Sequence, residues 1–322
     1  MRALVTGGAG FIGSSVVDAL TSSGAPVLAV DDLSHGRADN LRDALGSGAE
    51  LAEIDIRDAT SLRRAFSAFR PDTVFHLAAQ IDVRKSMVEP ALDAGINVLG
   101  TLNVLAAALE VGVRRVVNTS TGGAIYGETD VVPTPETVPA NPLSAYGLGK
   151  RTAEEYGSWF RRSHGLEVLT LRYGNVYGPR QDPRGDAGVI AIFCDRVLSG
   201  QRPVVFGDGK QTRDYVFVGD IVAANLAAAE ADAPAHEVYN VGTGTEVDVL
   251  TLAGAIADAA GVGRESFAPE LRPARPGEVL RSCLDVRRAR EDLGLGEPTP
   301  LADGLRRTLG WVRTLPPAER TA

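Results

Sequence analysis

The chain has 322 residues, 44% of them hydrophobic and 36 of them glycine, so it is long enough to bury the core of one α/β domain with a smaller lobe appended. A formal net charge of -8, without any run of lysine or arginine, argues against a nucleic-acid partner. Cys194 and Cys283 lie far apart and no histidines cluster, so neither a disulfide framework nor a zinc site is indicated. We expect a reduced, cytoplasmic protein without a targeting segment, because the first residues run straight into a strand, and without a membrane-spanning stretch.

The N-terminal half of the chain predicts alternating strands and helices. We expect strands at 2–6, 26–30, 50–55, 73–77 and 115–119, and helices at 14–23, 61–69 and 97–111. Alternation of this kind is typical of a parallel sheet covered on both faces, and right-handed crossovers make such a sheet doubly wound. Residues 129–142 contain four prolines and are predicted to form an extended loop before the next helix.

The C-terminal half is less regular. We expect a strand at 169–173, a polar loop at 179–188, a helix at 189–199, strands at 203–206 and 238–241, and a proline-rich loop at 269–277. The strand at 238–241 is predicted to return to the sheet, while the other separated segments predict a small second lobe. A ligand is expected in the crevice between the sheet and this lobe.

The turn between the first strand and the first helix carries Gly7, Gly10 and Gly13. Backbone without Cβ atoms can approach a pyrophosphate closely, and the helix N-terminus supplies amide donors and a partial positive charge. Asp31 ends the second strand, where a carboxylate accepts hydrogen bonds from the adenosine ribose hydroxyls and repels a 2′-phosphate. The turn therefore predicts NAD, although Arg37 nearby leaves NADP as an alternative.

Two further strand ends fit the same dinucleotide. Asp55 and Ile56 close the third strand and are predicted to meet the adenine ring. Small residues close the fourth strand, where the backbone must pass close to the cofactor: Leu77, Ala78 and Ala79. Plain packing at strand ends is the alternative for both groups.

Tyr146 and Lys150 are one helical turn apart, so both side chains project from the same face of a helix. A phenol is a poor base at neutral pH, but an adjacent lysine ammonium favours the phenolate. Tyr146 is therefore a candidate proton acceptor. An isolated pair at this spacing is common by chance, and it is the preceding glycine turn that favours the catalytic interpretation.

Together these motifs resemble the extended short-chain dehydrogenase/reductase family, most closely its nucleotide-sugar 4-epimerases of the UDP-glucose 4-epimerase type. The resemblance covers essentially the whole chain and rests on the order and spacing of segments 6–13, 31–32, 55–56, 76–79, 97, 146–150, 171–180, 211–216 and 275–278. It implies reversible inversion at C4 of UDP-glucose and UDP-galactose through a 4-keto intermediate and tightly bound NAD. Tyr146 would take the proton of the O4 hydroxyl as hydride passes to the nicotinamide, and Lys150 would hold the nicotinamide ribose and stabilise the phenolate.

The resemblance also implies two sets of binding residues. The cofactor set lies mainly at the predicted strand ends: Gly7, Gly10, Phe11, Ile12, Gly13, Asp31, Asp32, Ser34, Gly36, Asp55, Ile56, Leu77, Ala78, Ala79, Asn97, Tyr146, Lys150 and Tyr173. The substrate set comes mainly from the second lobe: Asn175, Arg180, Val189, Phe206, Arg213, Arg275 and Glu278. Two converging arginines, Arg213 and Arg275, suit a diphosphate, while surface ion pairs and core packing are the ordinary alternatives.

One position departs from the family pattern. The family usually has a serine or threonine four residues before the residue at Tyr126, where its hydroxyl assists the catalytic tyrosine, but this chain has Gly122. Thr121 is predicted to supply the hydroxyl as a third catalytic residue, with a water as the alternative. Gly122 and Gly123 also supply no acid of the kind that sugar 4,6-dehydratases and decarboxylating relatives need, which argues against both activities.

Several alternatives concern the substrate and the class of protein. Arg180 could meet a sugar carboxylate, so UDP-glucuronate is an alternative substrate, and N-acetylated UDP-sugars are another. A nucleotide-sugar reductase or dehydrogenase would exchange its cofactor with solvent. A non-catalytic NAD-binding sensor would have no use for the intact Tyr146 and Lys150.

The resemblance further implies a division of the chain and a homodimer. Residues 1–174 would form the NAD-binding domain, with 215–262 returning to it, and residues 175–214 and 263–322 would form the UDP-sugar-binding lobe. Helices at 100–111 and 149–163 would pack on their symmetry mates, with an apolar stripe of Leu102, Leu105, Ala106 and Leu109. The alternative is that this stripe packs only on its own sheet.

Overall fold

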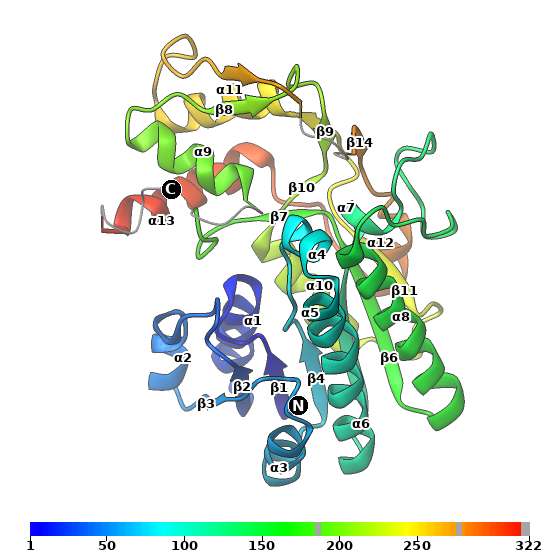
Figure 1. The fold of residues 1–322 in the computed structure, drawn as a ribbon. Coiled ribbons are helices and arrows are strands. Elements are labelled where there is room, and N and C mark those ends of the chain that lie inside the picture. Colours follow the sequence, from blue (N-terminus) through cyan, green and yellow to red (C-terminus); the bar gives the residue numbers. More distant parts are fainter. Residues whose placement is uncertain (184–187, 275–278, 317–322) are drawn as a thin grey trace.

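A seven-stranded parallel sheet forms the centre of the computed structural model, which describes residues 1–183, 188–274 and 279–316 (Figure 1). The strands are β1 (Ala3–Thr6), β2 (Val27–Asp31), β3 (Glu50–Glu53), β4 (Thr73–His76), β5 (Arg115–Thr121), β6 (Glu167–Tyr173) and β11 (Val238–Val241). Their order, β11-β6-β5-β4-β1-β2-β3, reverses between β1 and β4, and a ligand crevice is expected at the carboxyl ends of these two strands. The predicted doubly wound fold is confirmed, including the return of the strand at 238–241.

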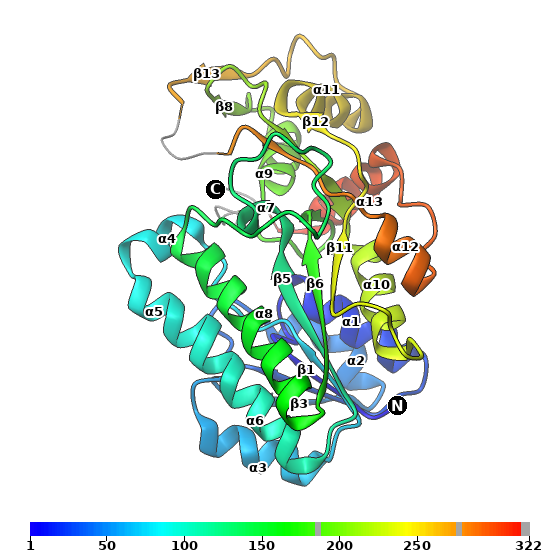
Figure 2. The same cartoon turned by 90° about the vertical axis from the view of Figure 1, so that its right-hand side faces the viewer.

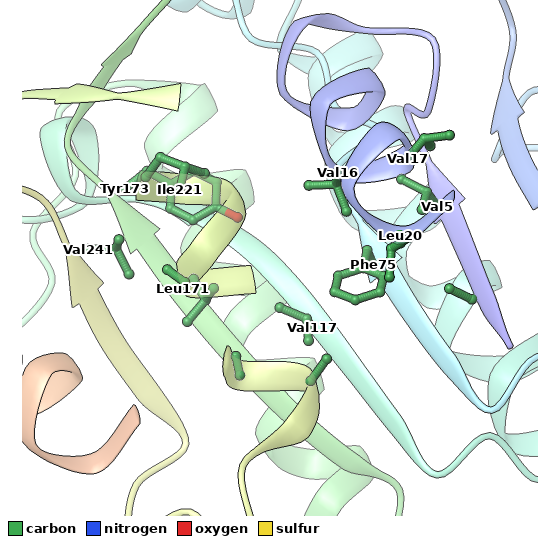
Figure 3. Packing of buried hydrophobic residues seen from close by; sticks show 14 of the residues in the cluster. Val5, Val16, Val17, Leu20, Phe75, Val117, Leu171, Tyr173, Ile221 and Val241 are labelled. Carbon is green, nitrogen blue, oxygen red and sulfur yellow. The ribbon is translucent and has the colours of Figure 1, made fainter. Parts of the chain in front are cut away.

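Helices cover both faces of this sheet (Figure 2). One face carries α1 (Phe11–Ser22), η1 (Ala38–Leu41), α2 (Arg42–Gly46), α10 (Val218–Glu230) and α12 (Arg287–Leu293), and the other carries α3 (Ala59–Phe69), α6 (Thr101–Val111) and α8 (Ala145–His164). Apolar residues at helical spacing on α1, Val16, Val17 and Leu20, join the same core as Val5 and Phe75 of the sheet (Figure 3). β1 is buried along its whole length, as a strand covered on both faces must be.

Two helices begin earlier than the sequence pattern suggested. α1 starts at Phe11 because the glycine turn leads directly into the helix. α3 starts at Ala59, behind Asp58, whose side chain accepts hydrogen bonds from the N–H groups of Thr60 and Ser61 at 3.0 and 3.1 Å. The cap therefore fixes a boundary that the apolar periodicity does not mark.

The helix expected at 97–111 is the end of a longer run. The run opens with α5 (Pro90–Ala94), passes through a π-helical turn, η2 (Gly95–Gly100), and ends with α6. By length and composition alone this run, Pro90–Val111, could cross a membrane. It also contains the buried polar residues Asp93 and Asn97, which are hydrogen-bonded to each other. A π turn inside a helix is frequent at functional sites.

The second lobe is built from separated C-terminal segments, as expected. Its core joins α9 (Val189–Leu198), α11 (Val249–Ala260) and α13 (Leu301–Thr314) to the paired strands β7 (Asn175–Tyr177) and β10 (Tyr215–Phe217). Short strands complete it: β8 (Val204–Phe206), β9 (Thr212–Arg213), β12 (Val247–Asp248), β13 (Glu270–Arg272) and β14 (Arg281–Ser282).

The expected division of the chain needs correction at two helices. α11 was expected to return to the sheet within 215–262, but it packs on α9 and α13 of the lobe. α12 was expected in the lobe within 263–322, but its Ala289 and Leu293 lie in the core of the sheet. The chain therefore passes between the sheet domain and the lobe more often than the sequence predicts. The other domain boundaries stay a proposal.

Candidate active site

The glycine turn packs against the loop that follows β4. A Cβ atom on Gly7 would lie 2.7 Å from the Ala78 amide nitrogen, and Gly7 has a φ of +68°, so only glycine fits there. A Cβ atom on Gly13 would lie 2.0 Å from the Gly7 carbonyl oxygen. α1 then begins at Phe11 with no side-chain cap and no acidic residue in its first turn. Its first N–H groups, at Phe11, Ile12 and Gly13, have no partner within the helix and can bind an anion.

Asp31 holds this turn in place from the end of β2. Its Oδ2 accepts a hydrogen bond from the Ala9 N–H and its Oδ1 accepts one from the Leu33 N–H, both at 2.9 Å. Burial raises the pKa of the carboxyl above its usual range. A Cβ atom on Gly36 would lie 2.6 Å from Oδ1, so the chain passes directly over the carboxylate. The Ser34 hydroxyl donates to Asp32 at 2.6 Å beside it.

The ends of β3 and β4 also converge here. Arg57 Nε donates to both Asp55 oxygens, at 3.0 and 2.9 Å, and this pairing lowers the pKa of the Asp55 carboxyl. Ile56 packs on the run behind it, since a Cβ atom on Gly100 would lie 2.5 Å from Ile56 Cδ1. The Leu77 N–H donates to the Thr6 carbonyl at 3.1 Å, and Ala79 follows in the same loop. The structure thus brings these predicted residues to one edge of the sheet, while their contacts with a cofactor stay a prediction.

The buried side chain of His76 holds the loop after β4 in place through a chain of hydrogen bonds. Thr101 donates its hydroxyl hydrogen to the Asn97 carbonyl at 2.7 Å, so it accepts from His76 Nε2–H at 2.9 Å. His76 Nδ1 then accepts from the Thr6 hydroxyl at 2.7 Å, and Thr6 Oγ1 accepts from the Ala78 N–H at 3.3 Å. Burial lowers the pKa of His76 to about 3, which keeps the ring neutral and this chain of donors in one direction.

Asn97 clamps the same loop from the π turn. The Gln80 N–H donates to Asn97 Oδ1 at 3.0 Å, and Asn97 Nδ2 donates to the Gln80 carbonyl at 2.9 Å and to Asp93 Oδ1 at 3.0 Å. Asn97, which the sequence predicts to bind the cofactor, therefore holds the loop after β4 in place beside the site.

Tyr146 and Lys150 occupy the first turns of α8, as predicted. Ser144 caps this helix by accepting from the Gly147 N–H at 3.1 Å, and the Tyr146 N–H donates to Ser86 Oγ of α4 (Val83–Val88) at 3.0 Å. A Cβ atom on Gly147 would lie 2.6 Å from the Ala124 carbonyl oxygen, so the glycine lets α7 (Gly122–Ile125) approach α8 closely.

Burial acts on the ionisation of both members of this pair. Lys150 is 5% exposed, its Nζ donates to the Thr119 carbonyl at 2.9 Å, and burial lowers the pKa of its ammonium to about 8. Burial likewise raises the pKa of Tyr146 to about 12, although a hydrogen bond from Thr121 acts in the opposite direction. The sequence predicts that the Lys150 ammonium favours the Tyr146 phenolate, and the loss of hydration acts against that effect, so the role of Tyr146 as proton acceptor stays a prediction.

Thr121 lies where the sequence predicted the assisting hydroxyl. Its Oγ1 accepts from the Ala124 N–H at 3.2 Å, which leaves the hydroxyl hydrogen available for the bond to Tyr146. A Cβ atom on Gly122 would lie 2.5 Å from Leu284 Cδ1, so the usual serine or threonine at that position would collide with Leu284 of the C-terminal segment.

A buried ion pair fixes α8 to the sheet behind Tyr146 and Lys150. Arg172 of β6 donates to Glu154 Oε1 and Oε2 of α8 at 3.0 and 2.6 Å. The same guanidinium donates to the Tyr126 hydroxyl at 2.8 Å, which in turn donates to Asn240 of β11 at 2.8 Å. α8 cannot shift relative to β6 without breaking these bonds.

Tyr173 and Asn175 continue the site toward the lobe. The buried Tyr173 hydroxyl accepts from Asn225 Nδ2 at 2.7 Å and lies 3.2 Å from Thr119 Oγ1. The Asn175 N–H donates to the Asp214 carbonyl at 2.7 Å. The Asn175 amide oxygen lies 3.5 Å from the Cβ position of Gly123, which places it beside α7.

The other predicted substrate residues are less closely grouped. Val189 starts α9 and packs on the lobe core, Phe206 ends β8, and Arg213 lies in β9 with Nη1 donating to the Thr212 carbonyl at 2.8 Å. Arg275 and Glu278 lie outside the described residues.

Arg180 has a partner that the sequence did not suggest. It forms an ion pair with Asp18 of α1 at 2.7 Å. With Asp18, Val218 and Trp311 it lines an open groove of about 400 Å³ between α1, α10 and α13. This pairing does not support a role for Arg180 as the contact to a sugar carboxylate.

Sequence reasoning overlooked Asp93 and Gln80 and gave His76 no role. The available signal for Asp93 was a carboxylate in the first turn of the apolar run of residues 90–111, four residues before Asn97. The bonds of Gln80 and His76 join segments far apart in the chain, and no local pattern marks them.

Comparison with known proteins agrees with this geometry. A model of the NAD dependent epimerase/dehydratase family matches residues 3–242. A UDP-glucose 4-epimerase of Mycolicibacterium smegmatis is 46% identical over 97% of this chain and 99% of its own length. The crystal structure of UDP-glucose 4-epimerase from Thermotoga maritima with UDP-glucose has a TM-score of 0.91 and 46% identity, covering 97% of this chain and 99% of that one. The Thermus thermophilus UDP-glucose 4-epimerase in complex with NAD has a TM-score of 0.89 and 41% identity, covering 98% and 99%. With a glycine turn, a Tyr146–Lys150 pair and these relatives, the chain belongs to the NAD-dependent epimerase/dehydratase family.

Proposed function

We propose that the chain is an NAD-dependent UDP-glucose 4-epimerase, which interconverts UDP-glucose and UDP-galactose. The observation that carries this proposal is the grouping of Tyr146, Lys150 and Thr121 at the carboxyl edge of the sheet, the edge that also carries the glycine turn. The close relatives described above bear that name along their full length.

The residues of the crevice fit NAD. The backbone at Gly7 lies against Ala78 and the backbone at Gly13 lies against Gly7, so a side chain fits at neither position. The first turn of α1 presents its backbone N–H groups without a competing carboxylate. Asp31 keeps further lone pairs for ribose hydroxyls after accepting its two backbone hydrogen bonds. NAD, when bound, supplies the acceptor and donor of the hydride and a positive charge on the nicotinamide.

The chain's own residues handle the proton. Tyr146 accepts the O4 proton of the sugar, and the Thr121 hydroxyl donates a hydrogen bond to the resulting phenolate. Lys150 adds a nearby ammonium, of whose three N–H donors the Thr119 carbonyl takes one. Because burial raises the pKa of Tyr146 to about 12, a further positive charge is needed beside it, and the nicotinamide is suited to provide it.

The position of Gly122 and Gly123 favours epimerisation over dehydration within this family. Removal of water from a sugar needs an acid and a base beyond Tyr146. Neither glycine supplies one, and Leu284 fills the space in which a side chain on Gly122 would lie. UDP-glucuronate is not favoured as the substrate, since Arg180 is paired with Asp18.

We further propose that Asn175, Phe206 and Arg213 contact the UDP moiety, with Val189 at its edge. Asn175 lies beside α7, and Phe206 and Arg213 lie on the short strands of the lobe that faces the crevice. The same assignment for Arg275 and Glu278 rests on the sequence alone. Cytoplasmic location is proposed with it, in keeping with the free, buried cysteines Cys194 and Cys283.

The direct test is Tyr146→Phe. Purified protein is incubated with UDP-galactose without added cofactor, and the products are separated. We expect the parent to form UDP-glucose and the variant to be about 10²–10⁴-fold slower while keeping its bound NAD, since only the proton acceptor is removed. Tyr156→Phe makes the same change elsewhere on α8 and should leave turnover unaltered, because it keeps the aromatic ring on the surface that is proposed below for the dimer.

Full activity of Tyr146→Phe would sink the mechanism. Parallel incubations with UDP-glucuronate and UDP-N-acetylglucosamine assign the substrate class. Loss of NAD on purification, together with consumption of added NADH in the presence of a keto sugar, would identify a reductase instead.

We also propose that the chain is a homodimer, through a different surface from the stripe expected on α6. In that stripe Leu105 is 1% exposed, and Leu102 and Leu109 pack on the core beside α3, so the stripe belongs to its own domain. The large apolar side chains that remain exposed on α4, η2 and α8 are Val83, Met87, Val88, Leu99, Leu148, Tyr156 and Trp159. On α8 they recur at helical spacing, on a face separate from Lys150 and Glu154.

A further inference from the structure

Asp93 is a buried carboxylate that lies against the catalytic helix. It is 1% exposed, and its Oδ1 accepts hydrogen bonds from Gln80 Nε2 at 2.9 Å and from Asn97 Nδ2 at 3.0 Å. Its Oδ2 points at α8, because a Cβ atom on Gly149 would lie 2.8 Å from it. Gly149 is flanked on α8 by Tyr146, one turn earlier, and Lys150, the next residue.

We propose that Asp93 is a positioning residue of the Tyr146–Lys150 pair: its buried negative charge keeps Lys150 cationic beside Tyr146, and its hydrogen bonds to Gln80 and Asn97 hold that charge against α8. The proposal rests on the proposed function, since it gives the Tyr146 and Lys150 pair its charge balance. Glycine at position 149 is then explained as the residue that lets the carboxylate reach α8.

Opposing influences act on the charge of Asp93. Burial is the largest and raises the pKa of the carboxyl, whereas the hydrogen bonds from Gln80 and Asn97 and the Lys150 ammonium favour the ionised form. In return, Asp93 acts against the burial that lowers the pKa of Lys150. The two charges therefore depend on each other.

The other ionisable groups described around Tyr146 and Lys150 are ion-paired, neutral or exposed. Glu154 of α8 also favours the Lys150 cation, but it is ion-paired with Arg172. His76 of β4 is neutral, and Arg84, Lys85 and Glu89 of the neighbouring helix and its end are exposed. The described hydrogen bonds of Asp93, by contrast, come from the neutral side-chain amides of Gln80 and Asn97. Its charge is therefore not cancelled by a guanidinium.

This arrangement has a consequence for Tyr146. Burial is the main cause of the raised pKa of the Tyr146 phenol, and the charge of Asp93 acts in the same direction. Removing the charge of Asp93 should lower the pKa of both Tyr146 and Lys150, since a nearby carboxylate stabilises the protonated form of each.

The test compares holoprotein of the parent and Asp93→Asn, which keeps the size and an acceptor oxygen. The chain has seven tyrosines, so the phenolate absorbance of Tyr146 is isolated by subtracting the titration of the matching Tyr146→Phe variant in each background. We expect the midpoint of Tyr146 to fall by at least about half a pH unit. The acid limb of kcat/KM should move the same way. Asp93→Glu, which keeps the charge, should restore both toward the parent.

Glu110→Gln is the matched control, because it removes the same charge from an exposed side chain at the end of α6. Its midpoint should equal that of the parent. If Asp93→Asn does not fold, Asp93→Ser provides a second neutral variant for comparison with Asp93→Glu.

A neutral variant that loses thermal stability or NAD while the Tyr146 midpoint stays in place would overturn the proposal, since Asp93 would then be only a packing residue. The outcome is separable from failure of the proposed function. If the parent does not epimerise UDP-sugars, the spectroscopic midpoint still decides the role of Asp93.

Discussion

At the level of single residues, the site is maintained by buried polar groups with assigned partners. His76 is the clearest case, because its two nitrogens link Thr6 of the glycine motif to Thr101 of α6. Its direction of hydrogen bonding requires a neutral ring. A protonated His76 would donate from both nitrogens, and Thr6 could then no longer donate to it.

This requirement predicts a specific acid sensitivity. The pKa of His76 is about 3 in the folded chain and about 6.5 when unfolded, so the unfolded state binds the extra proton between these values. The stabilisation is complete above about pH 6.5 and is lost as the pH falls toward 3, at up to about 1.4 kcal/mol per pH unit. The His76→Gln variant should be less stable than the parent at neutral pH. Its free energy of unfolding should also fall less steeply as the pH is lowered. Urea unfolding from pH 7 to 4 measures this, and parallel curves for parent and variant would contradict it.

At the level of elements, glycines set how closely the backbone segments approach. Gly147 brings α8 onto α7, Gly149 admits Asp93, and Gly13 lets α1 begin directly on the turn. In each case the neighbour is a backbone oxygen or a buried carboxylate rather than a flexible side chain. These contacts leave little room for adjustment.

Gly13→Ala tests this in the cofactor turn. Its Cβ would lie 2.0 Å from the Gly7 carbonyl oxygen, so α1 must move, and we expect a loss of about 1–3 kcal/mol in unfolding free energy with a reduced NAD content. Gly46→Ala, at the end of α2, is the control, since no atom of the described residues lies within 4 Å of its Cβ position. Thermal unfolding and the NAD released on denaturation give the two readouts. Equal behaviour of both variants would show that the turn tolerates a side chain.

At the level of the whole molecule, the proposed dimer explains the apolar side chains left on α4, η2 and α8. Leu99 is 59% exposed and lies among them, whereas Leu271 is 57% exposed on β13 of the lobe. Leu99→Glu should shift the protein to monomers in sedimentation experiments, because a buried charge without a partner destabilises an interface. Leu271→Glu should remain dimeric. A parent that sediments as a monomer would remove the basis for the dimer.

The sequence predicted the features that are local in the chain. The glycine turn, the Tyr146–Lys150 spacing and the alternation of strands and helices each depend on neighbouring residues, and the structure has them in place. The features that it did not predict depend on distant segments: Arg180 pairs with Asp18, α11 packs on α9, and Asp93 meets Gly149. The raised pKa of Tyr146 could not be predicted for the same reason, because the burial that causes it depends on the assembled fold.

The position of β11 at the outer edge of the sheet has a consequence for the order of folding. It pairs with β6 from Val238↔Thr170 to Val241↔Tyr173, and the whole of α9 and α10 is synthesised between these two strands. Until residue 241 leaves the ribosome, β6 presents an open strand edge of the kind that recruits other chains. α12, made later still, then covers β11 with Ala289 and Leu293. The last-made segments therefore cover the first-made sheet, and a nascent chain that stalls before them exposes the edge of β6, which is prone to aggregation.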